Sequence, residues 1–208
     1  MSGASPGAPR PTLAQASRTL RRERVLDAVG EVLGESVWAD VKMADVADAA
    51  GVSRQTLYNM FGGRRELAQA YVLREAEGFL AAVEEAIGSG GDDPRIALSA
   101  ALEIFLSAAE THPLVRAIST GEGGDELLGL VTARGAPVLG LVGEALAAML
   151  VEHWPELSGD EARTISDFLV RLAISHAALP SGTPADTAAT VTRILGPYLD
   201  ELLAVSRR

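Results

Sequence analysis

Apolar positions recur at helical spacing along most of the chain. The first stripe, in a helix expected from about Ala16, consists of Val25, Leu26, Val29, Val32 and Leu33. Residues three, four and seven apart lie on one face of a helix. No run shows the sustained alternation of apolar and polar residues that is typical of a half-buried strand. The pattern predicts an all-α fold of about nine helices.

Breaks in this pattern separate the expected helices. Gly34 ends the first helix and Gly51 separates two short ones. A long fourth helix is expected from Arg64, and its apolar positions continue from 67 to 86 without a break, as in a connector between domains. Beyond it we expect a loop at 121–124 and helices over 94–110, 113–119, 125–153, 159–179 and 185–205. Two of these helices should bend, at 135–137 and at 196–197, because proline removes a backbone donor.

The segment 43–67 carries the most specific pattern. Its sequence, MADVADAAGVSRQTLYNMFGGRREL, predicts two short helices joined by a tight turn, which is a helix-turn-helix arrangement. Gly51 suits a left-handed turn position, and Ser53 is a good N-cap for the second helix. The helical register exposes one set of polar side chains, with Leu57 and Phe61 directed inward; the exposed set is Arg54, Gln55, Thr56, Tyr58 and Asn59.

This arrangement predicts that the partner is double-stranded DNA. The second helix of such motifs enters the major groove, where Arg54 suits guanine and Gln55 suits adenine. Tyr58 and Asn59 are better placed for phosphates, and Arg64 opens a helix whose free amides favour a phosphate oxygen. The alternative is a small helical subdomain whose polar residues are merely solvated.

The charge distribution is compatible with DNA binding, although the net charge is −10. Residues 1–67 hold nine Lys/Arg against eight Asp/Glu, whereas residues 68–208 hold nine against twenty. Phosphate attraction is local, because salt screens charges over about 10 Å. Further positive charge lies upstream of the motif, at Arg10, Arg18, Arg21, Arg22 and Arg24.

The segment AGVSRQTLYNMFGGRREL resembles the motif of the TetR family of bacterial transcriptional repressors, and the resemblance covers about residues 18–67. It implies a homodimer whose N-terminal domains bind a palindromic operator and whose C-terminal domains hold a small effector. By position, it places Tyr58 and Arg64 at phosphates and 53–56 at the base-reading end. Lys42 stands where the family commonly has Thr, and Gln55 where Gly is frequent, so both bear on operator sequence.

We therefore expect a disordered arm over residues 1–15, which contain five Pro or Gly, a helix-turn-helix domain over 16–67, and an effector-binding and dimerisation domain over 68–208. The segment 112–118 resembles the one in TetR-family members that answer to fatty-acyl or lipid-like effectors. The expected effector is small and hydrophobic, and its candidate pocket residues are Phe105, Leu114, Ile118, Leu128, Val131, Val138, Val142, Phe168, Leu172 and His176. The same residues could instead form a domain core or, in the last two helices, the dimer face.

Little in the sequence indicates catalysis or a cofactor. Cysteine is absent, and the three histidines are far apart, so we expect no metal site and no cofactor. Ser175-His176 lacks a G-x-S-x-G turn, and residues 121–124 lack the spacing of a dinucleotide loop. No stretch of 18 apolar residues occurs, and the first residues lack the apolar centre of a secretory signal. We expect a cytoplasmic protein that is not an enzyme and has no membrane partner.

Three other interpretations stay open at this point. The chain could regulate a drug-efflux gene and sense aromatic or cationic compounds, although only 4% of its residues are aromatic. It could be an all-α enzyme, or another helical protein, in which the helix-turn-helix is incidental and DNA is not bound. It could also sense no small molecule and bind a partner protein, in which case the C-terminal core should be completely filled.

Overall fold

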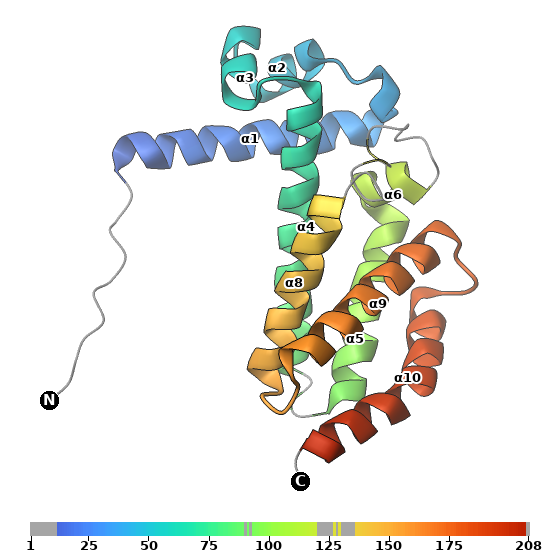
Figure 1. Ribbon diagram of the computed structural model, residues 1–208. Coiled ribbons are helices and arrows are strands. Elements are labelled where there is room, and N and C mark those ends of the chain that lie inside the picture. Colours follow the sequence, from blue (N-terminus) through green and yellow to red (C-terminus); the bar gives the residue numbers. More distant parts are fainter. Residues whose placement is uncertain are drawn as a thin grey trace, which may run out of the picture.

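The computed structural model describes residues 12–89, 91, 93–119, 127, 129 and 136–206. Over these residues the chain forms nine α-helices and one short 3-10 turn, η1, and no strand (Figure 1). The all-α prediction is confirmed. In chain order the elements are α1 (Leu13–Glu35), η1 (Trp38–Asp40), α2 (Met43–Ala50), α3 (Arg54–Phe61), α4 (Arg64–Ser89), α5 (Pro94–Thr111), α6 (Pro113–Ser119), α8 (Ala136–His153), α9 (Gly159–Ala178) and α10 (Pro184–Ser206).

A first core joins α1, α2, α3 and the start of α4. Val25 and Val29 of α1 are completely buried, as the apolar stripe predicts, together with Val46 of α2 and Leu57 of α3. Trp38 of η1 packs into the same core with only 1% of its surface exposed. The three helices therefore form a compact unit at one end of the molecule, seen at the top of Figure 1.

The turn between α2 and α3 has the predicted geometry. Gly51 ends α2 with φ +64°, in the left-handed region that favours glycine. The Val52 amide then donates to the Ala47 carbonyl at 2.9 Å, and Val52 packs against the core. Ser53 caps α3, since its Oγ accepts from the Thr56 amide at 3.1 Å. These contacts fix the angle between the two helices.

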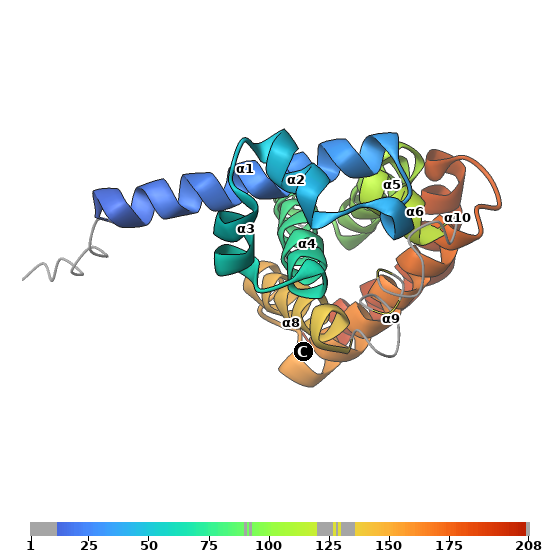
Figure 2. The same cartoon turned by 90° about the horizontal axis from the view of Figure 1, so that it is seen from above.

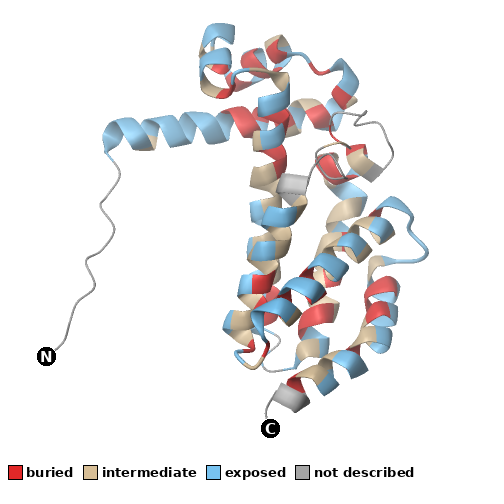
Figure 3. Ribbon diagram, in the orientation of Figure 1, coloured by how far each residue is buried: buried red, intermediate tan, exposed pale blue. Residues whose placement is uncertain are grey.

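The long helix α4 connects two cores. Its 26 residues span about 39 Å. Leu67 and Tyr71 are buried in the first core, and Ile87 is buried in a second core with Ala97 and Trp154. Figure 1 shows α8 lying along α4, with α5, α9 and α10 completing the lower part of the molecule. Figure 3 shows buried residues concentrated along the inward sides of these helices.

Several boundaries differ from those predicted. Helix α1 begins at Leu13 rather than near Ala16, because Thr12 and Gln15 form a capping box at its start. The last helix runs through Pro197, and Figure 1 shows it changing direction along its length. The predicted loop at 121–124 and most of the first part, 125–135, of the helix expected over 125–153 lie outside the described residues. No helix within the described ranges is both long and apolar enough to cross a membrane.

Candidate DNA-binding helix and apolar cavity

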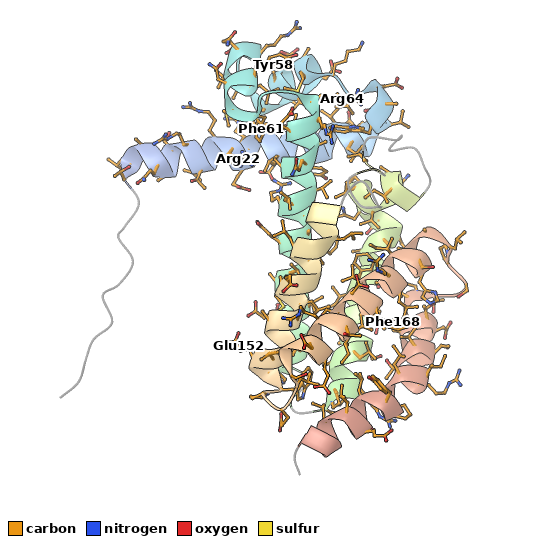
Figure 4. The ribbon with its side chains drawn as sticks, viewed as in Figure 1. Arg22, Tyr58, Phe61, Arg64, Glu152 and Phe168 are labelled. Atoms are coloured by element: carbon orange, nitrogen blue, oxygen red, sulfur yellow. The ribbon has the colours of Figure 1, made fainter. Side chains whose placement is uncertain are left out.

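Helix α3 presents a polar face to solvent. Arg54, Gln55 and Asn59 are exposed, Tyr58 is 47% exposed, and Thr56 is half-buried. The register follows the prediction, because Leu57 and Phe61 are buried on the opposite face. Figure 4 shows Tyr58 at the end of the molecule remote from Glu152 and Phe168. Most of the α3 side chains that the sequence predicts for DNA are therefore accessible.

Hydrogen bonds divide the side chains of α3 into two groups. Ser53 and Thr56 bond to each other, with 2.8 Å between their hydroxyl oxygens, at the helix N-terminus. Their role in this structure is to close the helix. Gln55 donates its Nε2 to Asn59 Oδ1 at 2.9 Å, which holds both amides on the outer face, one turn apart. Arg54 and Gln55 are thus the exposed side chains nearest the N-terminus of α3.

Arg64 lies differently from the prediction. It opens α4, as expected, but its side chain is half-buried and its guanidinium lies 5.0 Å from the centre of the Trp38 ring. Its Nη2 also donates to the Trp38 carbonyl. An arginine stacked on an aromatic ring is held by cation–π attraction. In this structure Arg64 therefore fastens η1 to the start of α4 instead of extending into solvent.

Lys42 is exposed directly before α2. The Asp45 carboxylate accepts from the Lys42 backbone amide at 3.2 Å, so the helix start is closed from within α2. The lysine head group therefore has no part in capping this helix. It adds a positive charge beside the helix-turn-helix.

The second feature is an apolar cavity of about 230 Å³ in the C-terminal domain. All of its described walls are apolar side chains, contributed by α4, α5, α6, α8, α9, α10 and the segment between α8 and α9. Phe79 and Phe105 meet edge to face in this wall, with 5.7 Å between ring centres. The C-terminal core is not completely filled, which counts against the partner-protein interpretation.

The structure brings together some of the predicted pocket residues and separates others. Those that line the cavity are Phe105, Leu114, Ile118 and Val142. Leu128 and Val131 lie outside the described residues, and the Val138 side chain does too, although its backbone belongs to α8. The structure also adds wall residues that the sequence prediction did not include, among them Val72, Phe79, Leu98, Trp154 and Leu169.

Phe168, Leu172 and His176 do not line this cavity. They lie in a separate hollow between α9 and α10, with Ile194 and Leu195. Phe168 is 51% exposed and faces away from the cavity, which α9 lines instead with residues such as Leu169. A wide apolar stripe on one helix has two sides, and spacing alone does not show which side faces the interior.

Four described residues belong to both the cavity and the helix-turn-helix core. Val72 of α4, Leu114 and Ile118 of α6, and Val142 of α8 line the cavity and also pack with the first core. Pro113 of α6 lies directly beside Gly34 near the end of α1: a Cβ built on that glycine would be 3.8 Å from the proline ring. The cavity wall is therefore continuous with the packing of the helix-turn-helix unit.

A polar network crosses the same junction. Arg74 of α4 donates to Asp27 of α1 at 2.6 Å and to Glu75 at 2.5 Å. His112, which ends α5, lies with its Nε2 2.9 Å from the other Glu75 oxygen. Burial would raise the pKa of Glu75, but hydrogen bonds from His112 and Arg74 hold it below its ordinary value. The network joins α1, α4 and the α5–α6 junction, and sequence spacing did not predict it.

Titration of nearby groups follows from their surroundings. Tyr71 is buried beside this network, and burial together with the Glu75 charge raises its pKa.

Within the described ranges, no three His, Asp or Glu side chains are grouped so that they could hold a metal ion. Besides the hollow between α9 and α10, the described residues thus offer two candidate binding sites, the α3 surface and the apolar cavity.

Comparison with known proteins identifies relatives of both parts. Residues 25–71 match the family model described as bacterial regulatory proteins, tetR family, and residues 93–197 match the model described as bacterial tetracyclin repressor, C-terminal domain. The chain is 34% identical to the HTH-type transcriptional regulator AlkX of Mycobacterium tuberculosis, over 90% of this chain and 89% of that protein.

Two further similarities extend this comparison. The crystal structure of the TetR family repressor AlkX from Dietzia sp. strain DQ12-45-1b, implicated in biodegradation of n-alkanes, superimposes with a TM-score of 0.75 at 35% identity, covering 88% of this chain and 96% of that one. The HTH-type transcriptional activator FasR of Mycolicibacterium smegmatis is 33% identical, but over 45% of this chain and 42% of that protein.

Proposed function

The chain belongs to the TetR family of bacterial transcriptional regulators, and from that premise we propose that it is a homodimeric repressor released from its operator by a small hydrophobic effector. The observation that carries the proposal is the shared wall. Val72, Leu114 and Ile118 contact the apolar cavity on one side and the helix-turn-helix core on the other. A ligand in the cavity therefore presses on the packing that positions α3.

We assign DNA binding to residues 16–67 and effector binding and dimerisation to residues 68–208. Arg54 and Gln55 are exposed at the N-terminal end of α3, the end that meets base edges in helix-turn-helix proteins. The exposed side chains of Tyr58 and Asn59, further along α3, and of Lys42, before α2, are assigned to phosphates. Ser53 and Thr56 hold the start of α3, and Arg64 holds η1 against α4.

The hollow between α9 and α10 is assigned to the dimer interface. Phe168, Ile194 and Tyr198 are 51, 64 and 56% exposed on this face, and contiguous exposed apolar patches mark interaction sites. Ile194→Asp should convert the dimer to a monomer in sedimentation velocity. Leu141, which is 58% exposed on α8, provides the matched control: Leu141→Asp should leave the dimer intact. A dimer in both variants would contradict the assignment.

The walls of the cavity support a hydrophobic effector. Ligand sites are mostly apolar with a few polar groups, and the described walls of this cavity contain no charged side chain. The relative from Dietzia is implicated in n-alkane biodegradation, which agrees with a long hydrocarbon chain as the recognised part. An aromatic cation finds less support. The rings of Phe79, Phe105 and Trp154 could stack on it, but no carboxylate lines the described walls to pair with its charge.

We propose repression rather than activation because the similarity to a known repressor covers more of the chain than the similarity to a known activator. The Dietzia AlkX, a repressor, matches 88% of the chain, whereas the activator FasR matches 45%. In a two-fold dimer the two α3 helices would lie about 34–36 Å apart to reach successive major grooves. An effector that binds better to a state with a different spacing would release the operator.

The proposal is tested by fluorescence anisotropy of the full-length protein on duplex DNA from upstream of its own gene. Hexadecanoic acid, hexadecanoyl-CoA and ethidium are added separately. Specific binding that is released by either hexadecanoyl compound supports the proposal. Release by ethidium alone would overturn the effector class and favour the drug-sensing alternative. Absence of specific binding to any segment of that DNA would overturn autoregulated repression.

A further inference from the structure

The first half of α1 extends beyond the rest of the molecule. Every residue from Leu13 to Arg24 is exposed except Ala16, which is half-buried, and the first fully buried residue is Val25. Figures 1 and 2, seen from perpendicular directions, both show this part of α1 projecting past α2 and α3. Twelve residues at 1.5 Å each make an overhang of about 18 Å.

The overhang has a defined start although none of its residues is buried in a core. The Gln15 amide donates to Thr12 Oγ1 at 3.2 Å, and the Thr12 amide donates to Gln15 Oε1 at 2.8 Å. This reciprocal capping satisfies two amides that a helix N-terminus otherwise leaves free. The fold does not need the overhang for its core, so its side chains are available for another purpose.

One face of the overhang is basic. Arg18, Arg21 and Arg22 are three and four residues apart, which places them side by side on a helix. Val25 and Val29 continue the same row at seven and eleven residues from Arg18, and both are completely buried in the helix-turn-helix core. The arginine face of the overhang therefore points to the side of α1 on which α2 and α3 lie.

Two contacts confirm this direction. The Arg22 guanidinium lies 4.7 Å from the centre of the Phe61 ring in the last turn of α3, and Figure 4 shows the two residues together. The one acidic residue of the overhang, Glu23, lies 3.9 Å from Arg74 of α4, on another face. Among the described residues Arg18 and Arg21 have no carboxylate within ion-pair distance.

We propose that residues 13–24 of α1 form a second DNA-contacting surface, in which Arg18 and Arg21 bind phosphates outside the stretch that α3 covers. The inference rests on the proposed DNA binding and adds a site to it. Guanidinium groups suit phosphate oxygens, and a reach of about 18 Å corresponds to about five base pairs at 3.4 Å each. Arg22, held on Phe61, fixes the direction of the overhang relative to the recognition helix.

The test compares Arg18→Gln/Arg21→Gln with a matched control, Arg95→Gln/Arg163→Gln. Glutamine keeps helix propensity close to that of arginine, so both variants lose the same charge. The control also loses the Arg95–Asp200 and Arg163–Asp160 ion pairs, and circular dichroism checks that both variants keep their helices. Arg95 and Arg163 lie at the end of the molecule remote from α3. They are close in sequence to Ala97 and Ala162, which pack with Ile87 near the end of α4. Anisotropy is measured on the operator from 50 to 200 mM salt, in duplexes with and without six added base pairs at each end.

In a dimer the variant loses four phosphate contacts, two from each protomer, which should reduce the slope of log K against log salt by about 3.6. The affinity advantage of the wild-type protein over the α1 variant should then shrink about 150-fold between 50 and 200 mM salt. The advantage should be larger on the longer duplex, and the control variant should match the wild type throughout. Equal slopes for wild type and α1 variant, with specific binding intact, would overturn the inference. Absence of specific binding by the wild type would overturn the proposed function instead.

Discussion

Replacing Leu114 with alanine tests whether the shared wall transmits the effector signal. Leu114 is 4% exposed and contacts both the cavity and the helix-turn-helix core. Leu98 is the matched control, because it is 6% exposed, lines the same cavity and packs with α10 rather than with the first core. Both substitutions make the same truncation beside the same cavity, but only one of them touches the packing behind α3.

The cost to stability should be similar in the two variants. Buried Leu→Ala substitutions cost about 2.7–5.0 kcal/mol, and less where the site can collapse or is already loosely packed. Each leucine borders an existing cavity on one side, so we expect about 2–3 kcal/mol in urea unfolding. For a chain of this size that corresponds to a fall in Tm of roughly 4–12 °C.

The response to effector should differ between them. Coupling between two sites is typically worth about 1–3 kcal/mol, or about 5–150-fold in affinity. In Leu98→Ala we expect the effector to weaken DNA binding as much as in the wild type, provided that the effector site is saturated in both proteins. In Leu114→Ala that weakening should be at least about fivefold smaller. Anisotropy titrations on operator DNA at saturating effector measure both. An equal reduction in the two variants would refute the shared-wall argument.

Three other substitutions test single features of the molecule. Arg54→Ala should relax base preference in a competition assay against mutated operators, whereas Tyr58→Phe should weaken operator and random DNA alike; the reverse pattern would contradict their assigned roles. Gly51→Ala places a side chain at φ +64° and should lower the free energy of unfolding by about 1 kcal/mol in thermal unfolding, and Gly51→Asn should lower it by less. Equal stability of the Gly51→Ala variant and the wild type would be inconsistent with the turn geometry. Because the pKa of Glu75 is lowered in the folded state, its charge stabilises the fold above about pH 4.3 and that contribution is lost as pH falls. Urea unfolding between pH 7 and 3 should therefore be less pH-dependent in Glu75→Gln, and an unchanged pH profile would show that the network does not contribute.

The helix-turn-helix was predictable because its local rules agree with one another. Gly51, Ser53 and the spacing of Leu57 and Phe61 each specify one feature of the turn or register, and the structure has all of them. Local chemistry did not reveal the surroundings of Arg64. Its contact with Trp38 joins residues 26 positions apart, and no spacing rule covers such a pair.

The C-terminal domain was less predictable for a related reason. Phe105 and Phe168 both belong to apolar stripes, yet one lines the cavity and the other is exposed between α9 and α10. Which side of a stripe faces inward depends on how helices from distant parts of the chain cross. The bond between Glu75 and His112, 37 residues apart, likewise depends on that crossing.

The length of α4 also shapes how the molecule encounters DNA. The helix holds its two ends about 39 Å apart, several times the roughly 8 Å over which charges act at physiological salt. Most of the excess negative charge belongs to residues 68–208, so once α3 is docked, repulsion from the far end of this acidic domain is almost completely screened. During diffusion the same charge disfavours encounters in which the acidic domain approaches first. The polarity of the molecule thus selects orientation during the search, at little cost to the strength of the final complex.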